Sequence, residues 1–473
     1  MTQRARTIWT FVVTSVALFM VALDNLVVTT ALPSIRTSLD AGLEGLEWTV
    51  NAYTLTFAVL LLTGAALGDR FGRRRLFMLG LLVFTGASAA AAVAPSLEAL
   101  VAARAVQGVG AAIVTPLTLT LLSAAVPVER RGLALGAWGA VGGLAVALGP
   151  LVGGAVVEGA SWQWIFWVNV PIGLALLPLS RWALAESRGP AGRLDLVGTG
   201  LVSAGLFGVV LGLVRGNGLG WTSPQVLASL ALGGIALAAF GGWERRTTAP
   251  MLPLGLFQSR GFAATNVASL LMFFGMFGSV FLLAQFLQTV QGYSPLEAGL
   301  RTLPWTGMPV LVAPMAGVLS DRIGGRPLLV SGLALQAVGL AWLALVTTPS
   351  VAYSSLVAPF VLSGVGMGLF FAPVANVVLS SVPRSAEGIA SGTNNAIREL
   401  GGVLGIAVLA SVFSGQGGYA GPQSFVDGLV PATWVGAGVV GLGALAAAAI
   451  PGRRTTTTVQ PAYAEPVAEP AGI

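Results

Sequence analysis

Two short segments of this sequence share one pattern: residues 68–75 read GDRFGRRR and residues 320–326 read SDRIGGR. Both contain Asp-Arg-x-Gly, and each follows an apolar run long enough to cross the ~30 Å hydrocarbon core of a bilayer as a helix. Self-similarity over such a spacing is typical of a chain built from two duplicated halves. The sequence therefore predicts a membrane protein with an internal repeat.

The composition agrees with a chain that lies mostly in lipid. Of the 473 residues, 55% are hydrophobic and 9% are charged, whereas about 25% are charged in an average soluble domain. The 64 glycines suit helices that approach one another closely, because lipid provides no hydrophobic force between them. We expect an all-α integral membrane protein.

Apolar runs of about 20 residues predict fourteen membrane-spanning helices. We place them near residues 8–32, 46–68, 76–94, 97–125, 132–157, 163–182, 196–214, 225–243, 262–287, 298–319, 327–347, 353–380, 388–413 and 430–450. An even number of spans puts both chain ends on one side of the membrane. Spans 1–6 match spans 9–14 around the repeated loop, so spans 7 and 8 are an inserted pair.

This pattern predicts four parts of the chain. They are a six-helix half at 1–190, two linker helices at 191–250, a second six-helix half at 251–450 and a disordered cytoplasmic tail at 451–473. Nineteen of the 24 basic residues, all of them arginine, fall on the side of the N-terminus. Basic residues accumulate on cytoplasmic loops, so both termini are expected in the cytoplasm of a bacterial cell whose plasma membrane holds the chain. The positive charge is thus a topology signal, and we exclude nucleic-acid binding.

The residue types that are missing exclude much chemistry. The sequence has no cysteine and no histidine, and reading it through finds no lysine. Disulfides, Cys/His metal sites, serine–histidine triads and a lysine-containing phosphate loop are therefore impossible within this chain. We expect no enzyme activity, no metal and no cofactor.

Five motifs appear in a fixed order. They are LDNLVVTTALP from Leu23, GDRFGRRR, RAVQGVG from Arg104, LGPLVGG from Leu148, and WQWIFWVNVPIG from Trp162. In this order the chain resembles the fourteen-helix drug:proton antiporter family of the major facilitator superfamily. The resemblance covers nearly the whole chain and implies two six-helix halves plus two linker helices, driven by a proton gradient.

Asp24 and Arg104 are the candidate proton-coupling residues. Asp24 lies eight residues before Leu32, about 12 Å below the expected outer end of its helix, and Arg104 lies seven residues after Leu97, about 10 Å deep. Ionisable groups inside a membrane are functional by default. Asp24 is expected to carry the proton, although a static ion pair is the alternative. The resemblance implies that Arg104 and Gln107 support coupling, while an arginine satisfied by backbone carbonyls is the alternative.

Two further motifs suggest gates. The resemblance assigns Asp69, Arg70, Gly72, Arg73 and Arg74 to a cytoplasmic gate; anchoring by positive charge on the inner side is the alternative.

The second gate motif lies in the fifth span. The resemblance assigns Gly149, Pro150, Gly153 and Gly154 to an antiporter motif that seals one end of the path. Tight packing of small residues alone would also explain them.

The substrate cavity is predicted from polar residues in the spans. The candidates are Asn25, Tyr53, Gln107, Gln285, Asn376, Arg398 and Glu399. Arg398 and Glu399 are neighbours in sequence and point about 100° apart on a helix. They therefore cannot form one simple pair, and we expect one to face the cavity and the other a neighbouring helix.

The expected function is proton-coupled efflux of small amphipathic or cationic drugs or antibiotics by a monomer that alternates access across the lipid bilayer. The lone anionic group at Asp24 favours such a substrate. Broad and dedicated specificity both remain open. A proton-coupled nutrient importer on the same fold is the main alternative, and a membrane sensor or enzyme is a remote one.

Overall fold

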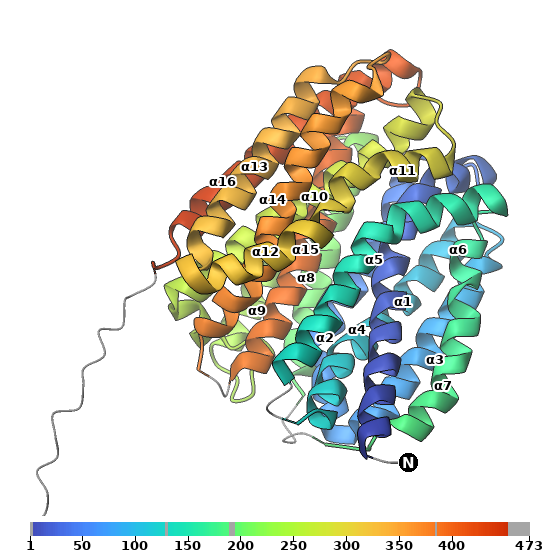
Figure 1. Cartoon of the computed structure of the whole chain (residues 1–473). Coiled ribbons are helices and arrows are strands. Elements are labelled where there is room, and N and C mark those ends of the chain that lie inside the picture. Colours follow the sequence, from blue (N-terminus) through green and yellow to red (C-terminus); the bar gives the residue numbers. More distant parts are fainter. Residues whose placement is uncertain (1–2, 128–130, 189–193, 384–385, 453–473) are drawn as a thin grey trace, which may run out of the picture.

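The computed structural model describes residues 3–127, 131–188, 194–383 and 386–452. Within these ranges, fourteen helical segments are long and apolar enough to cross a membrane. They overlap the fourteen expected spans one for one, which confirms the all-helical prediction (Figure 1). Most of the predicted tail at 451–473 lies outside the described residues.

The first six spans form one bundle. Its helices are α1 (Gln3–Ser38), α2 (Leu43–Phe71), α3 (Arg73–Ala92), α4 (Leu97–Ala125), α5 (Arg131–Gly159), and the pair α6 (Trp164–Trp167) and α7 (Asn169–Ala183), which together make one span. Ser96 starts α4 because its hydroxyl accepts a hydrogen bond from the Ala99 N–H, which satisfies an otherwise free helix-end donor.

The last six spans form the second bundle. Its elements are the short 3-10 helix η2 (Leu254–Gln258), α10 (Arg260–Gln285) with its π-helical extension η3 (Phe286–Val290), α11 (Pro295–Thr306), α12 (Met308–Ile323), α13 (Gly325–Val346), α14 (Tyr353–Ser380), α15 (Glu387–Gln416) and α16 (Pro422–Ala448). α11 and α12 form one span that is interrupted at Gly307.

Corresponding helices pack in the same pairs in both bundles. α3 packs on α4 as α13 packs on α14, and α1 packs on α5 as α10 packs on α15. α2 with α4 is likewise repeated as α12 with α14. Equivalent neighbours in the two bundles are what a duplicated sequence predicts.

The linker helices α8 (Leu196–Leu219) and α9 (Pro224–Glu244) lie beside the two bundles. They pack on each other, and α8 also contacts α2 of the first bundle and α15 of the second. Asp195 caps α8 by accepting the Gly198 N–H at 2.7 Å and the Trp243 indole N–H at 2.8 Å. Burial raises the pKa of the Asp195 carboxyl, but hydrogen bonds with Gly198, Trp243, Glu244 and Met251 together outweigh it, so the pKa lies below its usual value.

We call the side of the membrane that holds Gln3 and the end of α16 the terminal face, and the opposite side the outer face. The loop between α1 and α2 and the loop between α15 and α16 both lie at the outer face, since an odd number of spans precedes each. There α11 packs against α5, so the two bundles meet along this edge (Figure 1).

Candidate functional site

The structure brings Asp24 of α1 and Arg104 of α4 into direct contact. A guanidinium nitrogen of Arg104 lies 2.5 Å from Asp24 Oδ2, and neither side chain is exposed. Removing two charges from water is costly, and good geometry with further hydrogen bonds is needed to offset it.

The outer end expected for the first helix was wrong, although Asp24 and Arg104 do pair. α1 does not end at Leu32 but continues through Pro33 to Ser38, which places Asp24 fourteen residues, or about 21 Å, before its end. The apolar run stops earlier because the last turn carries polar residues such as Arg36. The end of the apolar run therefore underestimated the length of the helix.

Two neutral side chains complete the shell around Asp24. Gln107 and Asn169 each donate an amide N–H to Oδ1, at 2.8 and 2.7 Å. Ser88 Oγ lies 2.8 Å from the Gln107 amide nitrogen and 3.4 Å from that of Asn169. The carboxylate thus accepts three hydrogen bonds, from residues of α4 and α7, and Ser88 of α3 supports two of the donors.

Arg104 is also held by groups other than Asp24. Its Nε donates to the Thr49 carbonyl at 3.1 Å, and a terminal nitrogen donates to Gln107 Oε1 at 2.8 Å. The guanidinium lies 4.2 Å from the centroid of the Tyr53 ring, a cation–π distance. The ion pair and the backbone-carbonyl contact considered from the sequence therefore coexist.

Sequence reasoning missed Ser88, Asn169 and Thr49. Asn169 lies in the WQWIFWVNVPIG motif, where a single amide in an apolar run was the available signal. Ser88 lies in a run of small residues and Thr49 contributes a backbone oxygen, so neither gave any signal.

The antiporter motif of α5 lies at two interfaces. A Cβ added at Gly149 or Gly153 would collide with Leu26 or Val27 of α1, within the first bundle. A Cβ at Gly154 would meet the Pro295 backbone of α11, and thus the second bundle.

Pro150 completes the contact between the bundles. Its carbonyl faces Gly299 of α11 so closely that a Cβ at Gly299 would collide with it. The contact between the bundles therefore requires glycine at Gly154 of α5 and at Gly299 of α11.

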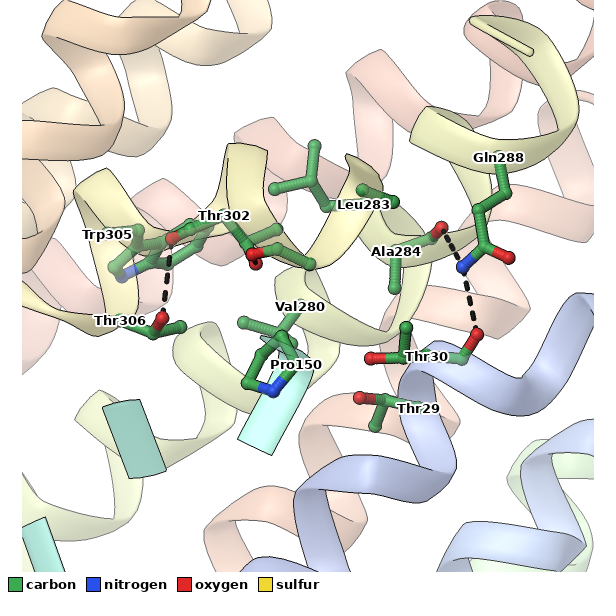
Figure 2. Close-up of a pocket in the computed structure, with 12 residues that line it drawn as sticks. Thr29, Thr30, Pro150, Val280, Leu283, Ala284, Gln288, Thr302, Trp305 and Thr306 are labelled. Atoms are coloured by element: carbon green, nitrogen blue, oxygen red, sulfur yellow. Dashed lines mark hydrogen bonds between the residues drawn. The ribbon is translucent and has the colours of Figure 1, made fainter. Parts of the chain in front are cut away.

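Hydrogen bonds join the two bundles near the outer face. Gln288 donates to the Thr30 carbonyl at 2.9 Å, Thr306 donates to the Ala147 carbonyl at 3.3 Å, and the Leu296 N–H donates to Glu158 Oε2 at 3.0 Å. Figure 2 shows the Gln288 amide of η3 pointing toward the Thr30 carbonyl of α1.

The space enclosed by this interface is small. The cavity bordered by Thr30, Pro150, Gln288 and Trp305 has a volume of about 10 Å³ (Figure 2), at the lower limit for one water molecule. The bundles are therefore closed on each other at the outer face in this structure.

The predicted gate residues at the terminal face bond within the first bundle. Arg73 Nε lies 2.7 Å from Asp69 Oδ1, and the Arg74 backbone N–H donates to Glu186 Oε1 at 3.0 Å. Gly72 has φ of 109°, a conformation that favours glycine, and Glu186 occupies the space a Cβ would need. Glu186 was not predicted from the sequence.

The remaining gate residue, Arg70, lies at the end of α2. Its guanidinium is 5.4 Å from the centroid of the Phe71 ring.

Arg398 and Glu399 lie in the middle of α15. The Arg398 guanidinium is 4.3 Å from the centroid of the Phe273 ring and donates to Asn395 at 3.2 Å. Arg398 Nε and Glu399 Oε2 are buried without a hydrogen-bond partner among the described residues.

The other cavity candidates have different surroundings. Asn25 is buried beside Asp24 in sequence, and Tyr53 donates to the Val21 carbonyl at 3.2 Å. Gln285 lies at the outer end of α10, where the Tyr419 hydroxyl donates to it. Asn376 is exposed. Tyr53 therefore belongs to the surroundings of Arg104, whereas Gln285 contacts Tyr419 and Asn376 is exposed on α14.

Known proteins resemble this chain along most of its length. The family model of the Major Facilitator Superfamily matches residues 14–406 and 265–471. The chain is 37% identical to the multidrug resistance protein Stp of Mycobacterium tuberculosis, over 86% of this chain and 75% of the relative. It is 39% identical to the cephamycin export protein CmcT of Amycolatopsis lactamdurans, over 86% and 85%. It is 35% identical to the tetracenomycin C resistance and export protein of Streptomyces glaucescens, over 89% and 79%.

Solved structures share the fold. A POT family transporter in complex with a thioalcohol conjugated peptide superposes with a TM-score of 0.70 at 13% identity, over 93% of this chain and 95% of the other. A bacterial homolog of the human lysosomal transporter Spinster gives 0.65 at 16% identity, over 94% and 98%. These structures show the fold alone, whereas the family model and the curated relatives show that the chain is a transporter and not an enzyme and that it belongs to the Major Facilitator Superfamily.

Proposed function

We propose that this transporter exports small amphipathic or cationic drug-like molecules, antibiotics among them, from a bacterial cell in exchange for protons. Three relatives carry names of multidrug resistance or antibiotic export proteins, which supports the direction of transport. The arginine-rich terminal face is then cytoplasmic, and the outer face opens to the outside. We propose that it works as a monomer and without a cofactor.

The observation that carries the proton coupling is the environment of Asp24. Its carboxylate is fully buried, faces Arg104 and accepts hydrogen bonds from residues of two helices. A proton on this carboxylate would remove the charge that holds Arg104 and change the packing of α1 against α4 and α7. Proton binding is thereby converted into a change of helix contacts, which alternating access requires.

The closed outer face fits one stage of this cycle. In the conformation described here the substrate path is shut on the outside by α5 and α11. Rocking of the bundles would break the contacts of Gly154 and Gly299 and open the outer side, while the terminal side closes. Inward flow of protons would drive this cycle in the direction of export.

Cells that express the chain test the proposal. Ethidium accumulation and a drug-susceptibility panel are measured with and without a proton uncoupler. We expect the chain to lower accumulation, the uncoupler to abolish the effect, and Asp24→Asn to export no better than cells without the chain. Asp427→Asn, which removes an exposed acid of α16, is the matched control and should export normally. Full proton-driven export by Asp24→Asn would refute the role of Asp24, and uptake into cells would refute the direction.

A further inference from the structure

A second acid, Glu47, is buried in the first bundle and takes no part in the cluster at Asp24. It lies four residues into α2, about 6 Å from the outer end of that helix, and is 2% exposed. Its Oε2 has no hydrogen-bond partner among the described residues. An ionised carboxylate with a buried oxygen that has no partner is costly in a membrane interior.

The charged and titratable groups around Glu47 are engaged elsewhere. On its own helix, Glu44 is exposed and pairs with Arg215 of α8 at 3.0 Å. From α1, the Arg36 guanidinium lies 3.6 Å from the centroid of the Tyr419 ring. Burial raises the pKa of the Tyr419 phenol, the Arg36 guanidinium lowers it and the Glu47 carboxylate raises it. Glu47 therefore lies near Tyr419, and we call Glu47, Arg36 and Tyr419 the corner.

Tyr419 connects this corner to the second bundle. It lies in the loop between α15 and α16, packed against Phe413 and Phe425 at ring-centroid distances of 5.5 Å each. Its hydroxyl donates to Gln285 of α10. Because Arg36 belongs to the first bundle, its contact with Tyr419 crosses from one bundle to the other while the outer face is closed.

Asn51, deeper in α2 than Glu47, also has buried polar atoms without a partner among the described residues. It lies one helical turn below Glu47, on the same face of α2, and is fully buried. Both its amide nitrogen and its amide oxygen lack a partner among the described residues. Buried polar atoms without partners are rare in proteins and call for a functional explanation.

We propose that Glu47 is a proton-binding residue of the outer gate. When the outer face opens, water reaches the carboxylate, which ionises by releasing its proton to that water. When a proton passes back from the water to the carboxylate, its charge rises from −1 to 0 and the corner can close under Tyr419 and Arg36. Acidity outside the cell thus favours the closed outer face. This inference rests on the proposed proton-driven export, to which it adds a second proton-binding residue.

The absence of cysteine in the chain makes a direct test practical. Nitroxide labels on Ser38→Cys, at the end of α1, and Gln423→Cys, at the start of α16, report the distance between the bundles at the outer face. In the otherwise unchanged chain we expect the ratio of closed to open molecules to fall as pH rises, by up to about tenfold per pH unit for one proton. Glu47→Gln should stay closed at every pH, because its side chain cannot ionise.

The controls separate Glu47 from the other acids. Glu44→Gln, on the same helix but exposed, should follow the unchanged chain. A pH response that persists in Glu47→Gln, or a chain that stays closed at every pH, would overturn the inference. A response that is lost in Asp24→Asn while Glu47→Gln retains it would assign the titration to Asp24 and also overturn it.

A second measurement needs no substitution at Glu47. Dicyclohexylcarbodiimide reacts with protonated carboxyl groups in apolar surroundings, and mass spectrometry locates the product. We expect modification of Glu47 at acid pH and slower modification as pH rises; a folded chain whose Glu47 stays unmodified at every pH would refute the inference. Neither readout needs transport, so normal ethidium export with a pH-independent gate refutes only the role of Glu47. A pH-dependent gate without export refutes only the proposed function.

Discussion

Replacing Gly154 by alanine should hold the two bundles apart at the outer face. The added Cβ would collide with the Pro295 backbone oxygen and lie 2.8 Å from Leu296 Cα of α11. Backbone atoms cannot rotate away as a flexible side chain can, so the closed contact itself must loosen. In the proposed conformation with an open outer face the two bundles separate here, so the added Cβ carries no such cost there.

The size of the effect follows from the cost of overpacking. One extra methyl group in a close contact costs about 1–3 kcal/mol, and about 1.4 kcal/mol is a factor of ten. The fraction of molecules with an open outer face should therefore rise about 5-fold to 150-fold, as long as closed molecules remain the majority.

A single cysteine measures this fraction. Thr30 is buried beneath the outer contact, so Thr30→Cys should react with a membrane-impermeant maleimide only when the outer face opens. Gly154→Ala should raise the reaction rate by the factor given above. Gly159→Ala is the matched control on the same helix, because a Cβ there meets nothing within 4 Å. Equal rates in the two variants would refute the assignment of Gly154 to the closed contact.

Two other substitutions probe the shell of Asp24 and the linker helices. Asn169→Leu removes one donor to the buried Asp24 carboxylate, and a hydrogen bond to a charged group is worth about 1.5–3 kcal/mol. Proton-driven ethidium export should therefore fall about tenfold or more, while the chain still inserts into the membrane. Unchanged export would refute a role for this donor. Asp195→Ala removes the cap of α8 and should lower the stability of the purified chain by about 1–2 kcal/mol near pH 7, measured by thermal unfolding. Because hydrogen bonds hold the pKa of Asp195 below its usual value, its contribution is present above about pH 4 and is lost as the pH falls further; a difference between the two chains that grows on acidification would contradict this.

The sequence predicted those features that depend on transfer of side chains into lipid. Fourteen apolar runs gave fourteen spans because each must be long enough to cross the hydrocarbon layer. Asp24 and Arg104 stood out because charges are rare and costly there, and the structure pairs them. The glycines of the LGPLVGG motif were expected at a close contact, and Gly154 lies at one with the second bundle.

The features that the sequence did not predict depend on neutral groups and on backbone atoms. Asn169 and Ser88 are ordinary helix residues until folding brings α7 and α3 to Asp24. The partner of Gly154 is a backbone oxygen, which every residue has, so its identity follows only from how the bundles dock. Glu47 lies in a short polar stretch at the start of a span, and only the burial of that corner distinguishes it from Glu44.

The hydrogen bonds between the two bundles near the outer face contribute little free energy to the closed conformation. Between helices in lipid there is no hydrophobic force, and a hydrogen bond there contributes about 0.6 kcal/mol on average. The bonds at Thr30, Ala147 and Glu158 therefore hold the bundles together by only about 2 kcal/mol in sum, apart from close packing of glycines on backbone. Loss or gain of one buried charge is worth as much, so a proton on a single carboxyl group can reverse the balance. Because these bonds are few and weak, the contact between α5 and α11 fits the proposed opening and closing of the outer face by protons.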